Sequence, residues 1–245
     1  MDKWALITGA AKRIGCSIAH QLHQDGFNIV IHYSQSCDEA RLLQSALNTL
    51  RPHSAIIMQA ELNNQTDLER FIFALNTQAL AIHVLVNNAS AFYPTPLGKT
   101  DYLQAQQLLA TNLLAPYFLA EQLAPTLKQQ HGVIINLIDI HAKRPLKDHG
   151  LYCMSKAALE MATLSLAQEL APEIRVNGIA PGAILWPTHS TEHDQQHVLA
   201  DIPLARLGQA DDIAKLVAYL VNASYVSGQI IAVDGGRSAV GFTGA

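Results

Sequence analysis

Short apolar runs rich in β-branched residues alternate with longer amphipathic runs along the whole chain. This alternation predicts βαβ units and a parallel sheet. The runs at 5–7 and 84–86 are apolar on successive residues, which is typical of strands buried on both faces. The expected strands are Trp4–Thr8, Phe27–Tyr33, Ser54–Gln59, Ile82–Asn87, Val133–Asp139, Ile174–Ile179 and Gln229–Val233, and the expected helices cover 14–25, 37–50, 65–78, 101–129, 152–171 and 211–222. We therefore predict a single doubly wound α/β domain over residues 1–245, with a seven-stranded parallel sheet flanked by helices.

The composition excludes several classes of protein. Charged residues make up 15% of the 245 residues and apolar residues 49%, whereas a typical soluble domain is roughly 25% charged. Mean hydropathy is +0.13, so the chain is not a disordered one. The net charge is −4 and the 16 lysines and arginines form no basic stripe, so no nucleic-acid partner is expected.

Targeting and membrane-spanning segments are not expected either. No apolar run approaches the roughly 18 residues that a membrane helix needs, so no membrane partner is expected. The first residues lead directly into an apolar strand, and we expect no signal peptide. Cys16, Cys37 and Cys153 are odd in number and lack metal-ligand spacing. Free thiols in a reducing compartment are expected, which predicts a cytoplasmic protein.

Glycines enclose a basic turn between the first expected strand and the first expected helix. The segment reads Thr8-Gly9-Ala10-Ala11-Lys12-Arg13-Ile14-Gly15. Free N–H groups at a helix N-terminus, together with the helix dipole, attract a phosphate. An ordinary strand–helix turn is the alternative, because a glycine-rich match is weak by itself. The position at the first strand–helix junction favours a nucleotide site.

The second expected strand ends in His32-Tyr33-Ser34-Gln35-Ser36, without the acidic residue that commonly binds the ribose 2′-hydroxyl of NAD. Asp38 and Glu39 come later, where they would favour the N-terminus of the next helix. Lys12 and Arg13 supply two cations, and the two serines supply hydrogen-bond donors. This chemistry suits a 2′-phosphate, so we predict NADPH rather than NADH. The alternative is that both cations are merely solvated.

Tyr152 and Lys156 lie four residues apart in an expected helix, so they share one of its faces. An ammonium beside a phenol lowers the tyrosine pKa from about 10, which would let Tyr152 exchange protons near neutral pH. Such a pair arises by chance in many helices, but Asp139 closes the fifth expected strand thirteen residues earlier. Asn88-Ala89-Ser90 and Pro181-Gly182 also follow strands. Ligands bind at the carboxyl ends of parallel strands, so one site is expected to contain them all.

Asn112 lies in a long apolar helix four residues before Pro116. Proline has no N–H, so the carbonyl of Asn112 loses its partner within the helix, and the helix is expected to kink. That carbonyl could bind a water molecule. The alternative is that Pro116 only bends the helix around the core.

Jointly, these segments resemble the short-chain dehydrogenases/reductases along essentially the whole chain. The matching segments are Thr8-Gly9 with Gly15, Asn87-Asn88-Ala89, Asn112, Tyr152-x-x-x-Lys156, Asn177-Gly178-Ile179-Ala180-Pro181-Gly182 and Val233-Asp234-Gly235-Gly236. The resemblance implies a Rossmann fold and catalysis by Tyr152 and Lys156, with a water on Asn112 connecting to Lys156 in a proton relay.

Two departures from the usual pattern resemble one branch, the pteridine reductases. Arg13 replaces the middle glycine of the turn, and Asp139 replaces the usual catalytic serine. The segments His32-Tyr33, 90–97 and 115–119 resemble that branch as well. The branch carries an arginine where this chain has Gln35, which predicts a weaker hold on the 2′-phosphate or greater reliance on Arg13.

This resemblance implies NADPH-dependent hydride transfer to a pterin. Phe92 would stack on the pterin, Arg13 and Ser90 would contact pterin and cofactor phosphates, and Asp139 with Tyr152 would relay the proton. The alternative for Asp139 is a capping carboxylate after the strand. Cofactor contacts are expected at Gly9, Lys12, Arg13, Ile14, Gly15, His32, Tyr33, Ser34, Ser36, Leu62, Asn88, Ala89, Ser90, Tyr152, Lys156, Pro181 and Gly182.

Other functions remain open at this point. Within the same branch, the chain could be a dihydromonapterin or dihydrofolate reductase, and oxidised pterin could also be accepted. Within the superfamily it could be a carbonyl reductase of the 3-oxoacyl type, which Asp139 and Phe92 disfavour. A regulator that binds NADP without turnover is the alternative outside enzymes, and the intact Asn112, Tyr152 and Lys156 argue against it.

The stretch 183–208 is rich in His, Thr, Pro and Gln and is expected to form a lid beside the ligand crevice. Trp186 would close over substrate or pack the lid. His189, His193 and His197 are spaced four apart, but the family reaction needs no metal, and none is predicted.

The shortage of charge also predicts an oligomer. The run 103–127 is apolar nearly all round and 156–170 has a wide apolar face. A helix that is apolar on every side must be buried. In the superfamily these two helices commonly form a dimer interface within a tetramer, so the resemblance implies a homotetramer.

Overall fold

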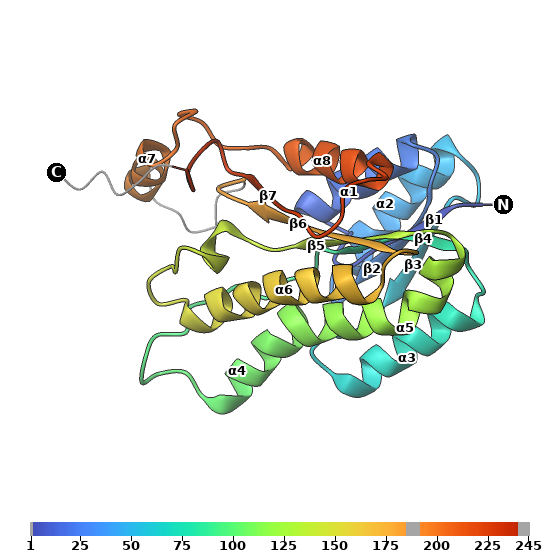
Figure 1. Cartoon of the computed structure of the whole chain (residues 1–245), viewed down its shortest axis with the longest axis horizontal. Helices are drawn as coiled ribbons and strands as arrows, with labels where there is room; N and C mark the ends of the chain where they lie inside the picture. Colours follow the sequence, from blue (N-terminus) through green and yellow to red (C-terminus); the bar gives the residue numbers. More distant parts are fainter. Residues whose placement is uncertain (1, 185–191, 240–245) are drawn as a thin grey trace.

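The computed structural model describes residues 2–184 and 192–239, and side chains at 192–195 are not described. Within these residues seven strands form one parallel sheet in the order β3-β2-β1-β4-β5-β6-β7 (Figure 1). The strands are β1 (Trp4–Ile7), β2 (Asn28–Tyr33), β3 (Ala55–Gln59), β4 (Ile82–Asn87), β5 (Val133–Leu137), β6 (Arg175–Pro181) and β7 (Ile230–Val233). β1 pairs with both β2 and β4, so the strand order reverses there. The predicted doubly wound α/β fold is confirmed.

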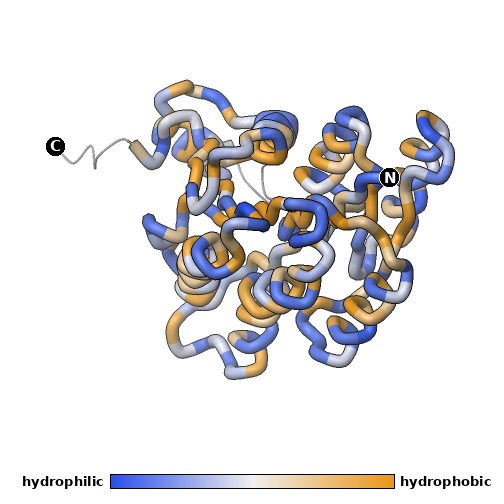
Figure 2. The backbone as a smooth tube through the Cα atoms, turned by 45° about the vertical axis from the view of Figure 1, so that its right-hand side comes forward, coloured by the Kyte–Doolittle hydropathy of each residue, from blue (hydrophilic) through white to orange (hydrophobic). Residues whose placement is uncertain are grey.

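Helices cover both faces of the sheet. On one face lie α1 (Arg13–Gln24), α2 (Cys37–Leu50) and α8 (Ala210–Asn222), and on the other lie α3 (Gln65–Thr77), α5 (Ala115–Gln129) and α6 (Gly150–Glu169) (Figure 1). Successive strand residues point to opposite faces, so Ile7 packs in one core and Leu6 in the other. Figure 2 shows the apolar strands at the centre of the molecule. Burial on both faces explains why these strands are apolar on successive residues.

The helix expected over 101–129 is interrupted. α4 (Tyr102–Leu109) begins at a capping box between Asp101 and Gln104, passes into the π-turn η1 (Ala110–Leu114), and continues as α5. Pro116 cannot donate an N–H to the carbonyl of Asn112, and a π-turn is one way to absorb that loss. The expected kink is therefore a local widening of the helix, and it lies at Asn112.

The sequence pattern does not predict two short elements. The 3-10 turn η2 (Ile140–Ala142) follows Asp139 directly, and α7 (Glu192–Ala200) lies within the stretch 183–208. Trp186 and His189 of that stretch lie outside the described residues, as does the side chain of His193. Among the helices that the structure describes, none is long and apolar enough to cross a membrane.

Candidate active site

A cavity of about 910 Å³ lies at the carboxyl edge of the sheet. Its walls include most of the predicted site residues: Gly9, Lys12, Arg13, Ile14, Gly15, His32, Tyr33, Ser34, Ser36, Leu62, Asn88, Ala89, Ser90, Phe92, Asp139, Tyr152 and Gly182. Three other predicted residues, Asn112, Lys156 and Pro181, are not in its wall. The size is at the upper end of the range for small-molecule sites. Residues scattered over the sequence are thus brought together where a doubly wound sheet binds ligands.

The glycine turn after β1 leaves no room for side chains. Gly9 has a positive φ of 62°, and a Cβ on Gly15 would lie 2.3 Å from the carbonyl oxygen of Gly9. Asn88 ties the turn to β4, because its Nδ2 donates to the carbonyls of Thr8 and Gly9 at 2.9 and 3.0 Å. The N-cap of α1, Lys12, makes no side-chain capping bond. A close backbone approach and an uncapped helix N-terminus fit a dinucleotide pyrophosphate.

His32 has a positioning role that the sequence does not reveal. The backbone N–H of Gly9 donates to Nδ1 at 3.0 Å, so Nε2 carries the proton and donates to the carbonyl of Ala60 at 3.2 Å. Burial lowers the pKa of His32 to about 4, and the bond to Ala60 opposes that shift only in part. The ring is therefore neutral and holds the glycine turn rather than offering a cation to the cofactor.

Arg13 has a backbone conformation that favours glycine. Its φ is 54°, in the left-handed region, at the position where the superfamily resemblance places a glycine. The side chain is exposed in the cavity wall. Among the described residues no hydrogen bond or ion pair holds its guanidinium. An arginine kept at a strained position with its charge free points to a ligand contact.

Two other predicted cofactor donors, Lys12 and Ser34, face carboxylates. Lys12 Nζ lies 2.7 Å from Glu39, with both side chains about half exposed. Ser34 Oγ donates to Glu61 at 2.6 Å. Glu39 is in the first turn of α2, as expected, but it also neutralises Lys12. Glu61, which follows β3, is a cavity residue that the sequence reading missed, and its signal was its position after a strand.

Tyr152 and Asp139 form a direct hydrogen bond. The phenol donates to Oδ2 of Asp139 at 2.6 Å, while Oδ1 accepts the backbone N–H of His141 at 2.8 Å. One oxygen of Asp139 therefore caps η2, as the alternative interpretation expected, and the other accepts the tyrosine hydroxyl, the contact that a proton relay would use. The capping bond orients the carboxylate toward the phenol.

The predicted lowering of the Tyr152 pKa is wrong in this geometry. Burial raises that pKa, and the charge of Asp139 and its hydrogen bond raise it further. Lys156 Nζ lies 5.8 Å from the centroid of the tyrosine ring and donates instead to the carbonyl of Leu137 at 2.8 Å. Burial lowers the pKa of Lys156 to about 8, although Asp139 acts in the opposite direction. Tyr152 thus retains its proton and is poised as a donor.

Asn112 joins three segments around this pair. Its Oδ1 accepts from Ala91 N at 2.8 Å and from Ser90 Oγ at 3.2 Å, and its Nδ2 donates to Ser155 Oγ at 3.0 Å and to the carbonyl of Ala91 at 3.0 Å. The residue is fully buried. The side chain therefore fixes the loop after β4 against α6, and this role is separate from the predicted water on its backbone carbonyl.

Phe92 is the exposed aromatic of the cavity. Its ring stacks on His149 at 4.7 Å between centroids and meets Tyr152 edge-on at 4.8 Å. It is 49% exposed. An aromatic face beside a proton donor can hold a flat heterocycle over it.

The wall also contains residues outside the predicted site, namely Glu61, Asn63, Thr111, His141, Leu146 and Arg237. Gln35, which was expected to weaken the hold on the 2′-phosphate, lines it too, as do Ala183 and Val198 of the stretch 183–208. His141 follows Asp139 by two residues, and Arg237 follows the glycine pair after β7. Position after a strand is the signal that could have found them. Within the described ranges, no group of three His, Cys, Asp or Glu side chains could hold a metal.

Comparisons with known proteins match nearly the whole chain. The family model described as enoyl-(acyl carrier protein) reductase matches residues 9–238. Pteridine reductase 1 of Leishmania tarentolae is 37% identical, covering 96% of both chains. A 3-oxoacyl-[acyl-carrier-protein] reductase of Staphylococcus aureus is 34% identical, covering 96% of this chain and 98% of the relative. An uncharacterized oxidoreductase of Bacillus subtilis is 31% identical, covering 96% and 99%.

Proposed function

The chain belongs to the short-chain dehydrogenase/reductase family, and on this premise we propose that it is an NADPH-dependent pteridine reductase. The observation that carries the proposal is the Tyr152–Asp139 hydrogen bond of 2.6 Å in a cavity whose wall includes Phe92. A hydroxyl in place of Asp139 would suffice to hold a carbonyl oxygen. Protonation of a ring nitrogen is better served by a phenol backed by a carboxylate. The relative named pteridine reductase supports the same substrate class.

The residues present fit NADPH. The glycine turn would hold its pyrophosphate, and Lys12, Arg13 and Ser36 would hold its 2′-phosphate, with Lys12 shared between phosphate and Glu39. Bound there, NADPH supplies a hydride. Lys156, positioned by the carbonyl of Leu137, would donate to the nicotinamide ribose.

The proton chemistry belongs to the chain itself. Tyr152 keeps its proton because burial and Asp139 raise its pKa, so it serves as the general acid at a ring nitrogen. Asp139 orients the phenol before transfer, and afterwards its carboxylate accepts a proton from solvent and passes it to the Tyr152 phenolate, which restores both groups. Phe92 would hold the pterin plane, and Asn112 positions the loop that carries Phe92.

Two other enzymatic functions have some support. The 3-oxoacyl-[acyl-carrier-protein] reductase relative makes a carbonyl reductase the second candidate, and Asp139 in place of a hydroxyl disfavours it. Dihydromonapterin, dihydrofolate and oxidised pterin are the alternatives within the proposed activity. An NADP-binding regulator is disfavoured because the proton donor and its carboxylate are already paired.

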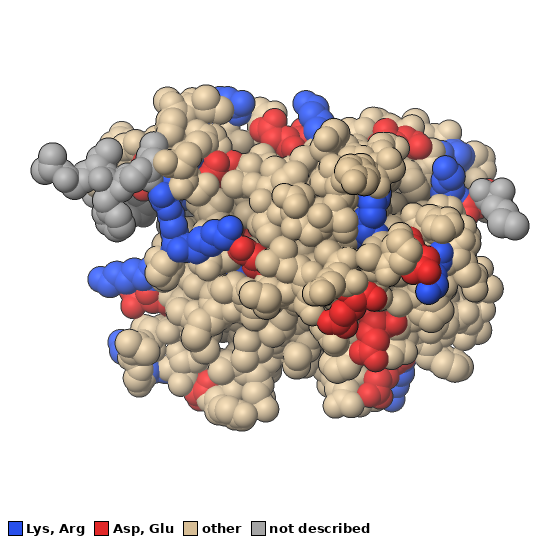
Figure 3. Space-filling model, viewed as in Figure 1, with Lys and Arg blue, Asp and Glu red and all other residues tan. Residues whose placement is uncertain are grey.

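We also propose a cytoplasmic homotetramer. The helices α4 to α6 expose apolar side chains, namely Tyr102, Leu103, Leu114, Tyr117, Phe118, Met154, Met161 and Leu164. Figure 3 shows one face of the molecule, on which charged side chains stand singly or in small groups on a largely uncharged surface. A second copy would cover the apolar faces of these helices. We expect the molar mass in solution, measured by light scattering, to equal that of four chains. A molar mass equal to that of one chain would contradict the proposal.

A substrate panel tests the function. NADPH oxidation is measured in parallel with dihydrobiopterin, dihydromonapterin, dihydrofolate and a β-ketoacyl thioester, and each active substrate is repeated with NADH. Turnover of a dihydropterin with a clear preference for NADPH is expected. Methotrexate, a pterin-like inhibitor, should protect the protein against thermal unfolding. Activity on the ketone without any pterin turnover would overturn the proposal, and a preference for NADH would overturn the cofactor assignment.

A further inference from the structure

An ion pair lies at the rim of the cavity, outside the machinery described above. Arg237 Nη2 lies 3.2 Å from Oδ2 of Asp201, which comes directly after α7. The two partners differ in burial, since the arginine side chain is 19% exposed and the aspartate 64%. Arg237 lines the same cavity as Phe92 and Tyr152, whereas Asp201 is not in its wall. The Arg237 guanidinium is therefore part of the site, whereas the Asp201 carboxylate that pairs with it lies outside the cavity and is exposed to solvent.

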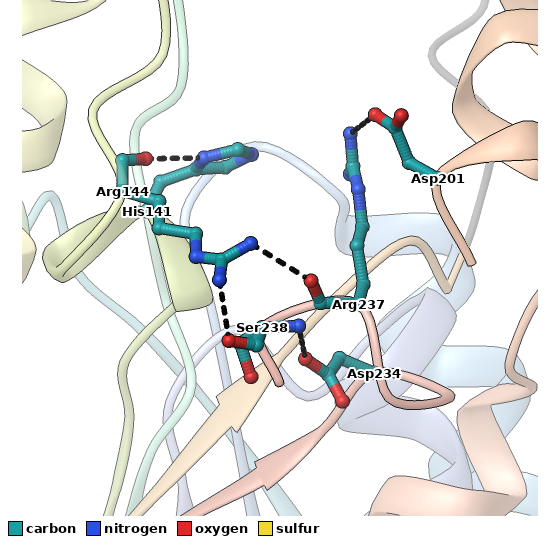
Figure 4. Close-up of polar contacts among 6 residues, drawn as sticks. All are labelled: His141, Arg144, Asp201, Asp234, Arg237 and Ser238. Atoms are coloured by element: carbon teal, nitrogen blue, oxygen red, sulfur yellow. Dashed lines mark hydrogen bonds and ion pairs between the residues drawn. The ribbon is translucent and has the colours of Figure 1, made fainter. Parts of the chain in front are cut away.

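The backbone that carries Arg237 is held from several sides (Figure 4). Arg144 donates to the carbonyls of Arg237 and Ser238 at 2.9 and 2.6 Å. Asp234 accepts the N–H groups of Gly236 and Ser238 at 3.0 and 2.6 Å. Burial pushes the pKa of Asp234 upward, but these hydrogen bonds and the charge of Arg144 lower it overall. The Asp234 carboxylate is thus committed to the backbone.

His141 adds a second polar group to the same rim. It lines the cavity, and its Nδ1 donates to the carbonyl of Arg144 at 2.8 Å. That bond leaves Nε2 as the ring atom able to meet a ligand. Figure 4 shows His141 and the Arg237 side chain on two different segments, after β5 and after β7.

We propose that Arg237 is a specificity-determining residue that binds an anionic group on the side chain of the substrate, with His141 as a second polar group of the same cavity wall. The inference rests on the proposed function and adds to it a preference for dihydropterins whose tail carries a carboxylate or a phosphate. Asp201 shows that the Arg237 guanidinium can hold a carboxylate from outside the cavity, and a substrate anion would approach the same guanidinium from within it. The Asp201 carboxylate is largely exposed, and pairs with exposed groups are weak, so a ligand anion can displace Asp201 from Arg237. Arginine recognises carboxylate and phosphate alike.

Three substrates and three variants test the inference. The substrates are dihydromonapterin, with an uncharged side chain, its phosphate ester, and dihydrofolate, with carboxylates. Arg237→Gln should raise KM for the charged substrates about tenfold and leave the uncharged one within about twofold. Asp201→Asn removes the competing anion, so KM for the charged substrates should fall. Lys143→Met removes an exposed cation that pairs with Glu160 outside the cavity and should change none of them.

The outcomes separate two failures. An equal rise in KM for all three substrates, or no rise for the charged ones, would overturn the anionic subsite while leaving pteridine reduction standing. Failure of the wild type to reduce any of the three would overturn both proposals. A rise confined to the phosphate ester or to dihydrofolate supports the subsite and identifies which anion it takes. Thermal unfolding of each variant shows whether a KM change comes with a loss of folding.

Discussion

The two ends of the cavity are built in different ways. At the phosphate end, the charged groups are exposed, as in the Lys12–Glu39 pair, where the side chains are 49% and 44% exposed. At the catalytic end, Lys156 is 2% and Tyr152 5% exposed. Solvent screens exposed charges, whereas burial shifts the pKa of a side chain and fixes its orientation. The phosphate end can therefore tolerate rearranged charges, whereas the catalytic end depends on individual atoms.

The largest effect is expected at the catalytic end. Tyr152→Phe removes the proton donor and should lower kcat by roughly 100- to 10,000-fold, while NADPH binding, followed by fluorescence titration, stays nearly unchanged. Tyr93→Phe is the matched control, because that phenol donates to a backbone carbonyl of α4, that of Gln104, and Tyr93 is not in the cavity wall. An unchanged kcat in Tyr152→Phe would show that Tyr152 is not the proton donor. The catalytic end would then depend no more on individual atoms than the phosphate end does.

An intermediate effect is expected from His32, a buried titratable group that supports the phosphate end. The pKa of His32 is about 4 in the folded protein and about 6.5 in the unfolded chain. Between these values the unfolded chain binds the additional proton, so stability is lost as pH falls from about 6.5 to 4, by up to about 3 kcal/mol. The His32→Asn variant should lack this part of the decrease in the free energy of unfolding at acid pH.

Urea unfolding of wild type and His32→Asn at several pH values checks this. The variant should be less stable at pH 7, because it loses the bonds to Gly9 and Ala60, and the difference should narrow toward pH 4. A difference that is independent of pH would show that His32 is not held neutral.

The smallest effect is expected at Arg13. Arg13→Gly and Arg13→Ala both remove the cation, so KM for NADPH should rise about tenfold in each. Glycine relieves the positive φ of 54°, whereas alanine keeps the strain, so Arg13→Gly should be more stable than Arg13→Ala by about 1 kcal/mol. Steady-state kinetics and thermal unfolding measure the two effects separately. If KM for NADPH were unchanged in both variants, the Arg13 charge would not contribute to NADPH binding.

The fold was largely predictable from the sequence, because the spacing of apolar residues and the burial of the strands determine it. Each strand boundary lies within two residues of its expected position, since a strand buried on both faces is apolar throughout. The glycine turn was predictable for a similar reason, because only glycine fits at Gly15. What was not predictable depends on long-range contacts. Sequence spacing placed the Lys156 ammonium beside the phenol of Tyr152, and the resemblance added Asp139 as a partner in proton transfer. In the folded chain only Asp139 of these two bonds the phenol, because Lys156 donates to the carbonyl of Leu137. The rim residue Arg237 is brought to the site only by β7.

The π-turn at Ala110–Leu114 has a consequence for insertions and deletions. A regular α-helix turns by about 100° per residue, and the wider π-turn accommodates one residue more than a regular helix would between α4 and α5. Leu108, fully buried on α4, packs with Tyr152 and Cys153. Deleting one residue from this turn would convert it to regular helix and keep Leu108 in that contact, whereas deleting one from the regular part of α5 would rotate the residues before it by about 100°. The π-turn therefore makes this segment more tolerant of a change in length than the regular helix on either side.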